Sequence, residues 1–417
     1  MESNLILLGK KLDEIFLVVI IILTINCLFY IHGIVNTNKF RTFVMKLLYK
    51  CCSIFKIFPI NKRKIIFING HSELFNGNIK AIYDEINKNK NSYKLIIYTK
   101  KDMSDSSNKS LKRLNKNILK IYNIFTAKNI IVNDYISLFS KIKIRKDTNL
   151  IQVWHAGGAF KKFGRDSLQN IKNPSNMKNC VACHSQYDKV IVSSSEISEI
   201  YANAFGVNVK KVIPLGLARA DKFYDEIAKN KIKESFLDKY PILKGKKIIL
   251  YAPTFRDGQR KKFNLKLDLE YLYNNLSNEY AVITKMHPFI KNGVEVPVEL
   301  CDRIMDLSYE DIDDLMISSD LLITDYSSMI FEYAIMKKPM IFFAYDLPLY
   351  DNSLRGFYYN YTEFVPGPIA VNTEEIVEII KCNKCDLNRI SEFKKKFNGY
   401  DDGEATKRIV KNILENK

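Results

Sequence analysis

Two serines lie where a predicted strand gives way to a predicted helix. The apolar run 321–324 is short and rich in branched residues, as is typical of a buried parallel strand. Apolar residues at helical spacing then follow Ser328. At such a junction the unpaired N–H groups and the positive helix end favour an anion, and the hydroxyls of Ser327 and Ser328 add donors. The sequence therefore predicts a diphosphate site here, with ordinary capping of the helix by serine as the alternative.

Three of the five histidines directly follow predicted strands, namely His71, His155 and His287. In an open parallel sheet, ligands bind beyond the carboxyl ends of the strands, so these are candidate site residues, with a structural role as the alternative. His155 is the strongest candidate, because an imidazole can take the proton from a hydroxyl that attacks phosphorus. Gly157 and Gly158 beside it allow the backbone to approach a substrate closely.

Two segments carry a resemblance to a known family. The segment I-T-D-Y-S-S at 323–328, followed by F-E-Y, K-K-P, an apolar strand and L-R-G-F, resembles the C-terminal signature of the CDP-glycerol glycerophosphotransferases, which build teichoic acid and related capsule polymers. The segment W-H-A-G-G-A-F-K-K-F-G at 154–164 is similar to the W-H-G-x-x-x-K-x-x-G segment of that family. The resemblance covers residues 64–417. It implies transfer of glycerol phosphate from CDP-glycerol to an acceptor hydroxyl, with His155 as the base and CMP as the leaving group.

The resemblance also implies roles for residues that follow other strands. Arg219 would pair with phosphate through two N–H groups, His287 would donate to the diphosphate as a second catalytic residue, and Glu332 would contact a ribose or alditol hydroxyl. A surface salt bridge for Arg219 and an exposed helix charge for Glu332 are the alternatives. The complete predicted set of substrate-binding residues is His155, Ala156, Gly157, Gly158, Ala159, Arg219, Pro253, Thr254, Lys285, Met286, His287, Ser327, Ser328 and Glu332.

The predicted site needs no metal ion and no cofactor besides the donor substrate. D-x-D at 311–313 matches the metal motif of a different glycosyltransferase class, GT-A, but it lies on a predicted helix, and we interpret it as a solvated face. The charge of the leaving CMP can be met by Lys285, Arg219, His287 and the helix end.

Eight cysteines include two C-x-x-C pairs, at 180/183 and 382/385, the first of which is followed by His184. Attachment of haem c and a shared zinc ion are the alternatives that these patterns allow. The pairs lie far apart in a long chain that can build a large core, unlike those of a zinc ribbon. We therefore expect ordinary reduced cysteines.

The composition is basic as well as apolar. The chain has 417 residues, 47% of them hydrophobic, and 64 Lys or Arg against 46 Asp or Glu, which gives a formal net charge of +18. Such a charge suits nucleic acid, an anionic membrane surface or a phosphate-rich substrate. Because the sequence has no zinc finger, no RNA-recognition signature and no dense basic helix, we expect an anionic membrane surface and a polyanionic substrate, and no nucleic acid.

Residues 15–35 form an apolar segment of 21 residues, which is long enough to cross a bilayer. Eight basic residues and no acidic residue follow between 36 and 64, and this bias keeps the bulk of the chain in the cytoplasm. We therefore predict a single-pass protein of the cell membrane with its catalytic domains on the cytoplasmic face, which suits a lipid-linked polyprenyl-diphosphate acceptor. A signal peptide and a hydrophobic helix packed on the protein itself are the alternatives.

Strand and helix patterns alternate from residue 64 onward. The predicted strands are 64–69, 93–98, 118–122, 130–132, 150–154, 190–193 and 212–214 in the first half, and 247–251, 280–286, 304–306, 321–324 and 340–343 in the second, with helices at 78–87 and 387–416. This pattern predicts an α/β protein of GT-B architecture, with two Rossmann-like domains that face a cleft, after an N-terminal transmembrane helix. The predicted division is a membrane anchor with a basic amphipathic segment at 1–60, an acceptor domain at 61–220, a CDP-alditol-binding domain at 245–385 and a C-terminal helix at 386–417 that packs back.

Two other functions remain open. One is a nucleotide-sugar glycosyltransferase of GT-B architecture, because fold alone does not fix function. The other is a non-catalytic, membrane-tethered binder of nucleotides or polyanions, which is favoured by two departures from the family pattern. Residues 156–158 read A-G-G where G-T-P is commoner, and Ala218 replaces a proline. The same departures leave the choice between a glycerol and a ribitol donor open.

Overall fold

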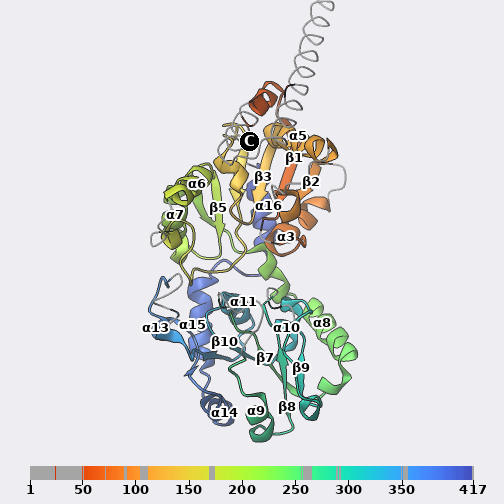
Figure 1. Ribbon diagram of the computed structural model, residues 1–417, viewed down its shortest axis with the longest axis vertical. Helices are drawn as coiled ribbons and strands as arrows, with labels where there is room; N and C mark the ends of the chain where they lie inside the picture. The colour runs from red at the N-terminus through yellow and green to blue at the C-terminus, as the bar shows by residue number, and fades with distance from the viewer. Residues whose placement is uncertain are drawn as a thin grey trace, which may run out of the picture. The chain divides into compact units, whose positions relative to one another are not determined.

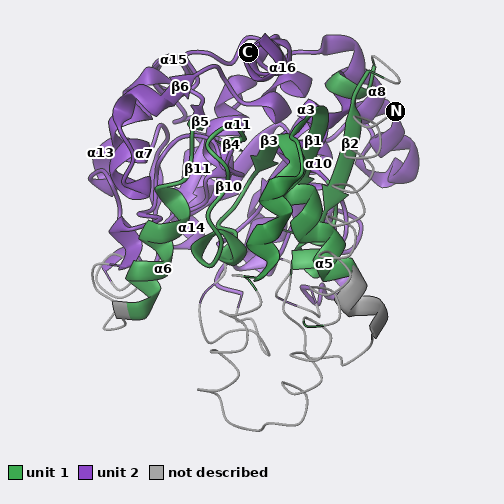
Figure 2. Ribbon diagram, turned by 90° about the horizontal axis from the view of Figure 1, so that it is seen from above, with its two compact units in different colours: residues 1–75, 86–152, 174–189 green, residues 76–85, 153–173, 190–417 purple. Residues whose placement is uncertain are grey.

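The computed structural model describes residues 24, 49, 51–70, 72–88, 92–103, 111–168, 174–254, 256, 265–287, 290, 293–348, 350 and 356–415, without the side chains of residues 111–115 and 174 (Figure 1). The chain divides into two compact units. Unit 1 comprises residues 1–75, 86–152 and 174–189, and unit 2 comprises residues 76–85, 153–173 and 190–417 (Figure 2). All of the predicted site residues belong to unit 2.

The first sheet has six parallel strands in the order β2-β1-β3-β4-β5-β6. Its strands are β1 (Asn61–Ile68), β2 (Lys94–Tyr98), β3 (Ala127–Val132), β4 (Asn149–Gln152), β5 (Lys189–Val192) and β6 (Val212–Pro214). The helices in this half are α3 (Gly77–Asn87), α4 (Lys100–Met103), α5 (Leu111–Thr126), α6 (Pro174–His184) and α7 (Ser198–Phe205).

One predicted strand of this half is wrong. Residues 118–122 form part of α5 and not a strand. The buried positions Ile121, Ile124 and Phe125 recur at helical spacing, while Leu119 is exposed. The apolar run is therefore one face of an amphipathic helix, which a short window of sequence cannot separate from a buried strand.

The second sheet also has six parallel strands, in the order β12-β11-β10-β7-β8-β9. Its strands are β7 (Lys247–Tyr251), β8 (Tyr280–Thr284), β9 (Ile304–Asp306), β10 (Leu321–Thr324), β11 (Met340–Phe343) and β12 (Ile369–Ala370). The helices are α8 (Glu226–Lys239), α9 (Leu269–Asn275), α10 (Ile312–Ser318), α11 (Met329–Ile335), α13 (Tyr361–Phe364), α14 (Thr373–Lys381), α15 (Leu387–Phe397) and α16 (Ala405–Glu415). Two parallel α/β sheets therefore confirm the predicted Rossmann-like architecture.

The order of the second sheet contains a topological switch point. The chain runs outward from β7 through β8 to β9, then returns to the other side of β7 with β10 and continues outward to β11 and β12. β7 and β10 are neighbours, but the loop after β7 leads to one side of the sheet order and the loop after β10 leads to the other. A crevice for ligands forms at such a point in open α/β sheets.

The core of unit 2 is built from the central strands, whose residues are almost fully buried on both faces. This burial explains why they read as continuous apolar runs of Ile, Leu, Val and Phe. Each fully buried side chain of this kind contributes about 1.5–3 kcal/mol to stability. The rigid sheet that results holds the loops at its carboxyl edge.

The predicted last helix, 387–416, is in fact two helices, α15 and α16. The break begins at Asn398 and ends near Gly403, which has a φ of 90°. Buried Asp401 accepts a hydrogen bond from the Asn398 amide at 2.7 Å, and this local pairing competes with the helix.

Short 3₁₀ helices complete the described elements, at Ser53–Ile57, Ser137–Ser140, Asp166–Leu168, Ser195–Ile197, Val209–Lys211, Ala218–Phe223, Pro241–Leu243 and Val298–Leu300. Across the part of the chain that the structure describes, no helix is both long and apolar enough to cross a membrane. The predicted span at 15–35 lies outside the described residues, apart from residue 24, and stays a prediction.

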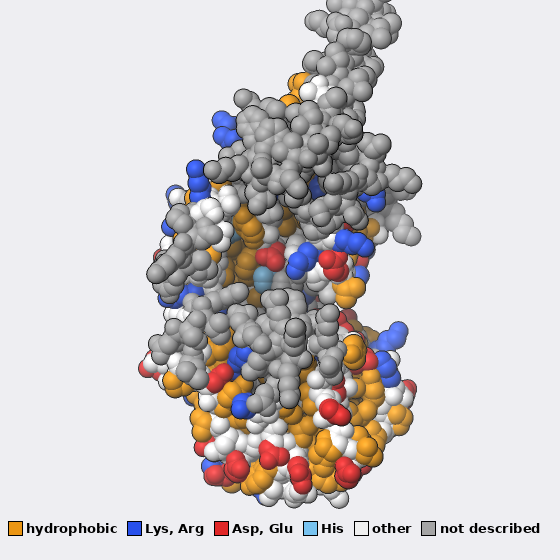
Figure 3. All heavy atoms as spheres, viewed as in Figure 1, with side chains coloured by type: hydrophobic (Ala, Val, Ile, Leu, Met, Phe, Trp, Pro, Cys, Tyr) orange, Lys and Arg blue, Asp and Glu red, His pale blue; other side chains and the backbone are white. Residues whose placement is uncertain are grey.

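The basic excess of the chain is not spread evenly. On the face shown in Figure 3, acidic side chains gather at the end of unit 2 that carries α9 and α14. Exposed Glu270, Glu279 and Glu374 lie on or beside these elements. This end of unit 2 therefore does not suit a polyanion.

Candidate active site

Three predicted donor-binding segments meet at the carboxyl edge of the second sheet. Tyr251, the last residue of β7, lies in register with Ile323 of β10 on one side and with Thr284 of β8 on the other. The pairing continues past the strands, because Ala252 N–H donates to the Ile323 carbonyl and Lys285 N–H donates to the Tyr251 carbonyl, both at 2.9 Å. The loops after β7, β8 and β10 are thus held side by side, and those after β7 and β10 flank the topological switch point.

The loops after β7 and β10 are tied together by Asp325. One of its oxygens accepts the N–H of Thr254 at 2.8 Å and the N–H of Tyr326 at 2.6 Å. The Thr324 hydroxyl donates to the Ala252 carbonyl at 2.7 Å. Asp325 was not among the predicted site residues, although it lies within the I-T-D-Y-S-S segment. Its role could have been suspected from its place at the strand end.

Helix capping and diphosphate binding were the two interpretations of the serine pair, and the two serines differ in how they fit the first. Ser327 Oγ accepts the Met329 N–H at 3.3 Å, as a capping serine does. Ser328 occupies the N-cap of α11, but its side chain makes no capping hydrogen bond. Capping therefore accounts for the hydroxyl of Ser327 and not for that of Ser328. The diphosphate site at this junction stays a prediction.

The segment after β8 presents its three residues differently. The Lys285 ammonium donates to the carbonyls of Ser308 at 2.5 Å and Glu310 at 2.7 Å, and burial lowers the pKa of Lys285. The Met286 side chain is buried in the core, and its N–H donates to Ser308 Oγ. His287 is exposed. Of these three side chains, that of His287 is therefore the most accessible to a ligand.

His155 lies on a turn whose backbone is fixed from two sides. Trp154 just before it has a φ of 48°, in the left-handed region, and the centroids of the two rings lie 4.4 Å apart with the ring planes tilted by 32°. The Asn78 amide donates to the carbonyls of Val153 and Trp154 at 3.2 and 3.1 Å. The strained backbone is thus stabilised by hydrogen bonds, and it sets the direction of the half-buried His155 side chain.

The two glycines of this turn pack against α11. Gly158 has a φ of 59°, and a Cβ added to it would overlap the ring of Phe331. A Cβ on Gly157 would lie 3.1 Å from Cβ of Phe331. The Tyr201 hydroxyl donates to the Gly158 carbonyl at 2.8 Å. The close approach that these glycines permit is therefore to a neighbouring helix of the same unit.

Glu332 is buried, with 2% of its surface exposed, so its interpretation as an exposed helix charge is wrong. Its carboxylate accepts the N–H of Gly157 and lies 3.8 Å from a guanidinium nitrogen of Arg219. Burial raises the pKa of Glu332, while the charge of Arg219 opposes the shift. α11 therefore begins at the serine pair and, one turn later, holds the His155 turn through Glu332.

Arg219 forms a salt bridge, as the alternative predicted, but the pair is half-buried and belongs to a larger charge network. Its guanidinium pairs with Asp313 and approaches Glu332, while the backbone N–H of Arg219 donates to Oδ1 of Asn78 at 3.0 Å. Lys222 contacts the other oxygen of Asp313 at 2.6 Å. Burial would raise the pKa of Asp313, but the two cations outweigh it and lower the pKa.

The interpretation of residues 311–313 as a solvated face holds for Asp311 and is wrong for Asp313. Asp311 is the exposed N-cap of α10 and accepts the N–H groups of Asp313 and Asp314. Asp313 is buried because it faces Arg219. Helical periodicity placed both on one helix but could not reveal the cation that Asp313 meets.

Two predicted site residues carry buried donor atoms without a hydrogen-bond partner in the structure, namely the Thr254 hydroxyl and Arg219 Nε. An unsatisfied buried donor costs about 1–3 kcal/mol, which an added acceptor would recover. Arg303 Nε, at the opposite edge of the sheet, shares this state. Because Arg303 lies away from the predicted site, an unpartnered donor does not by itself indicate a ligand. At the predicted site it supports one because the loops after β7, β8 and β10 also converge there.

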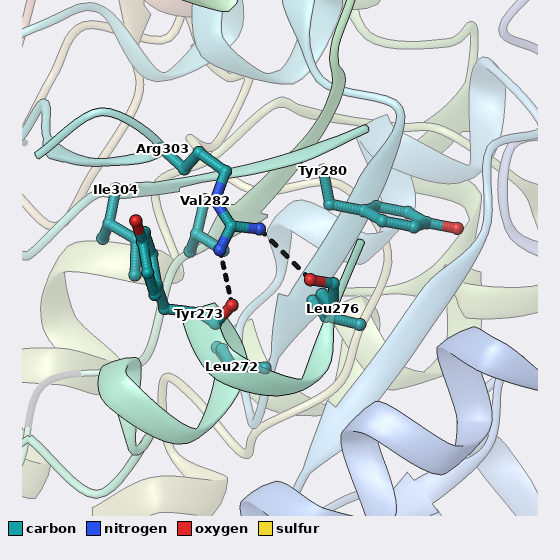
Figure 4. A pocket seen from close by; sticks show the side chains of 7 residues that line it. All are labelled: Leu272, Tyr273, Leu276, Tyr280, Val282, Arg303 and Ile304. Atoms are coloured by element: carbon teal, nitrogen blue, oxygen red, sulfur yellow. Dashed lines mark hydrogen bonds between the residues drawn. The ribbon is translucent and has the colours of Figure 1, made fainter. Parts of the chain in front are cut away.

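Two described hollows lie away from the predicted residues. The first is a small cavity at the opposite edge of the second sheet, closed by Leu272, Tyr273, Tyr280 and Arg303, with room for about one water molecule (Figure 4). The second is a groove lined by α13 and α15. None of the predicted site residues lines either hollow. His71 lies outside the described residues.

Comparison with known proteins gives the class. Residues 51–415 match the sequence model of the CDP-Glycerol:Poly(glycerophosphate) glycerophosphotransferase family, and the chain belongs to this family. The predicted family is thereby confirmed.

Particular relatives are named for two alditol phosphates, ribitol phosphate and glycerol phosphate. The chain is 38% identical over 385 residues to the teichoic acid poly(ribitol-phosphate) polymerase of Bacillus spizizenii, covering 91% of this chain but 61% of that protein. It is 34% identical to the teichoic acid glycerol-phosphate primase of Bacillus subtilis, covering 82% of this chain and 90% of the relative. The solved wall teichoic acid polymerase TagF superposes with a TM-score of 0.73 at 25% identity, over 91% of this chain and 98% of that one. TagF has also been solved as a variant soaked with CDPG.

Proposed function

We propose that this protein transfers glycerol phosphate from CDP-glycerol to a hydroxyl of a lipid-linked acceptor, releasing CMP, in teichoic acid biosynthesis. One observation carries the proposal beyond family membership. The short helix α11 begins at the serine pair and holds the His155 turn through Glu332. The residues proposed to bind diphosphate and the residue proposed to take a proton thus both contact one element of unit 2, which supports the proposal.

In the proposed reaction the acceptor oxygen attacks the β-phosphorus of the donor. His155 takes the proton of the attacking hydroxyl, a new P–O bond forms, and the bond from the β-phosphorus to the bridging oxygen breaks so that CMP leaves. His287, exposed beyond β8, donates to the diphosphate as negative charge moves onto CMP. No metal or cofactor takes part in this proposal.

Binding of the donor would use the loops at the switch point. Two buried donors, the Thr254 hydroxyl and Arg219 Nε, have no hydrogen-bond partner within the described part of the chain. The Ser328 hydroxyl makes no capping hydrogen bond to α11. Phosphate oxygens are suitable acceptors for all three. Arg219 is already paired with Asp313, so it would add hydrogen bonds more than net positive charge.

CDP-ribitol is the second candidate donor. Relatives of the two kinds are similarly close, at 38% identity for a ribitol-phosphate polymerase and 34% for a glycerol-phosphate primase. Residues 156–158, where the chain departs from the commoner family pattern, lie beside His155, where the alditol or acceptor would bind. Glycerol is proposed first because the matching family is defined by it.

We further propose that the protein works at the cytoplasmic face of the cell membrane. The apolar segment 15–35 and the eight basic residues between 36 and 64 support this placement. An anionic membrane surface would attract the basic segment, and the anchor would keep the site near a polyprenyl-diphosphate acceptor.

The test is release of CMP by the full chain, extracted from membranes, with CDP-glycerol or CDP-ribitol and a lipid-linked disaccharide acceptor. Release with CDP-glycerol that is lost in His155→Ala and in His155→Gln supports the proposal and the base. We expect a loss of about 100-fold or more, because general base catalysis contributes about 10²–10⁴-fold. Thermal unfolding of both variants should match the wild type, since His155 is half-buried on a turn.

Other outcomes change the proposal in defined ways. Unchanged release in both variants removes His155 from the mechanism. Release with CDP-ribitol alone keeps the mechanism and changes the donor. Binding of CDP-glycerol without release of CMP from either donor contradicts catalysis and favours a nucleotide binder.

A further inference from the structure

Arg256 is a buried cation in unit 2 to which the predicted site gave no role. Only 7% of its surface is exposed. Its guanidinium donates to Asp325 at 2.7 Å and, through two nitrogens, to both oxygens of Asp346 at 2.9 and 3.0 Å. It also donates to the carbonyl of Thr254 at 2.5 Å. One side chain therefore connects the loops that follow three neighbouring strands, β7, β10 and β11.

Aromatic rings enclose this guanidinium. Its central carbon lies 5.1 Å from the ring centroids of Tyr326 and Tyr350 and 5.4 Å from that of Tyr345. Tyr326 and Tyr350 are themselves stacked at 3.9 Å. Burial would lower the pKa of Arg256, but hydrogen bonds to Asp346 and the charge of Asp325 raise it above its ordinary value. Arg256 is therefore a permanent cation in a rigid setting.

The geometry leads from Arg256 to the predicted diphosphate donors through Asp325. Arg256 holds one oxygen of Asp325, and the other oxygen accepts the N–H groups of Thr254 and Tyr326. Thr254 carries an unpartnered hydroxyl. Tyr326 is the residue before the serine pair, and its hydroxyl donates to Asp346 at 2.9 Å. A shift of Arg256 would thus move both loops at the switch point together.

We propose that Arg256 is a positioning residue of the donor site, which fixes the relative position of the Thr254 loop and the Ser327–Ser328 loop so that both can bind one diphosphate. The proposal rests on the proposed function. It does not require Arg256 to touch the substrate. Lysine cannot replace it, because an ammonium lacks the planar fork that binds both oxygens of Asp346.

Arg303 offers a matched control in the same unit. It is as buried as Arg256, with 6% of its surface exposed, and its guanidinium lies 3.9 Å from the ring centroid of Tyr273. Its hydrogen bonds go to the backbone carbonyls of Tyr273, Leu276 and Ser277 at the end of α9, as Figure 4 shows for two of them. It lies at the opposite edge of the second sheet, so Arg303→Lys imposes the same chemical change away from the site.

The experiment compares Arg256→Lys, Arg303→Lys and wild type in the full-length, membrane-extracted protein. The measurements are KM and kcat for CMP release from CDP-glycerol, the Kd of CDP-glycerol, and thermal unfolding. We expect Arg256→Lys to raise KM and Kd about tenfold or more, with kcat changed less than about threefold, because misplaced binding groups weaken donor binding. We expect Arg303→Lys to leave KM and Kd within about twofold while lowering the unfolding temperature similarly.

Asp346→Asn is the second variant, in case Arg256→Lys does not fold. It keeps the pairing of Arg256 with Asp325 and weakens its two-point contact with Asp346, so KM should rise by a smaller factor, about threefold. Equal effects of the two lysine variants on Kd would overturn the proposal, as would an unchanged Kd in Arg256→Lys and Asp346→Asn. If wild type binds CDP-glycerol without releasing CMP, the proposed function fails, and the Kd values still decide the role of Arg256.

Discussion

The two edges of the second sheet hold their buried arginines for different purposes. At the carboxyl edge Arg256 binds carboxylates from two neighbouring loops, and at the opposite edge Arg303 binds carbonyl oxygens at the end of α9. The second arrangement caps one helix, where a cation meets the negative end of the dipole. The first cross-links the loops that follow three neighbouring strands. At the opposite edge the charge of Arg303 thus caps the end of one helix, and at the carboxyl edge the charge of Arg256 fixes neighbouring loops relative to one another.

The turn at His155 is also fixed relative to another element, because Gly158 packs against Phe331 of α11 and leaves no room for a larger residue. We expect Gly158→Ala to give the largest effect, a destabilisation of about 3 kcal/mol or more, since it combines a left-handed φ with overlap against Phe331. CMP release should fall with it, because the His155 turn must move. Chemical denaturation and the release assay measure the two effects.

Gly245→Ala is the control for backbone strain alone. Gly245 has a φ of 77°, and a Cβ there would meet nothing within 4 Å. It lies just before β7, at the edge opposite the site. We expect a destabilisation of about 1 kcal/mol and normal CMP release. Equal destabilisation by the two alanines would contradict the packing argument.

The charge network around Arg219 gives the next effect. Asp313→Asn removes the carboxylate that pairs with Arg219 and Lys222 inside unit 2, so two cations remain near each other. We expect a destabilisation of about 3 kcal/mol, as for other broken buried pairs, and a raised KM for the donor because Arg219 loses its anchor. Denaturation and initial-rate kinetics test these outcomes.

Asp314→Asn is the matched control on the same helix. Asp314 is half-buried, and burial raises its pKa, so removing its charge should be neutral or slightly stabilising. A raised KM in this variant as well would show that any substitution on α10 disturbs the donor, and that Asp313 has no specific role.

The sequence allowed the strand ends to be predicted but not the links between them. The strands β7, β9, β10 and β11 have the predicted bounds, because buried parallel strands read as short apolar runs with polar residues after them. The order of the strands in the sheet is a property of the fold. The contacts that depend on that order, such as Arg256 with Asp346, therefore had no signal in the spacing of residues.

Burial of charge was the other feature that sequence could not reveal. Glu332 and Asp313 both lie on helices where periodicity alone permits a solvated face. Each is buried because it meets Arg219, whose segment lies about 100 residues earlier in the chain. The α5 helix illustrates the reverse error, since a correct apolar pattern was assigned to a strand.

Asp401 offers a smaller effect than Asp313, and one that depends on pH. It is buried in the break between α15 and α16, and it accepts the Leu217 N–H at 2.7 Å, two residues before Arg219. Burial raises the pKa of Asp401 to about 7, with further contributions from Glu332 and Asp221, while hydrogen bonds from Asn398 and Leu217 oppose the shift. The carboxyl group is therefore protonated in the folded protein at mildly acidic pH.

The consequence for stability follows from the sign of this shift. Because the pKa in the folded state lies above the ordinary value of 3.8, the stabilisation is fully present below about pH 4 and is lost as the pH rises through 7. We expect the contribution of Asp401 to fall by about 2 kcal/mol between pH 5 and pH 8. Asp401→Asn should lack this loss and so gain stability relative to wild type at pH 8, as measured by chemical denaturation at both values.

Asp402→Asn is the control that tests whether the pH dependence comes from the burial of Asp401 or only from its position in the break between α15 and α16. Asp402 is exposed, and its hydrogen bonds to Arg408 lower its pKa, so it stays ionised from pH 5 to pH 8. Its variant should therefore change stability by the same amount at both pH values.

Asn398 can turn its unpartnered Oδ1 toward the new amide in Asp401→Asn, which keeps that variant folded. If the difference between wild type and Asp401→Asn is also the same at pH 5 and pH 8, Asp401 does not titrate in this range. Its burial is then offset by its hydrogen bonds, as the burial of Asp313 is offset by its cations.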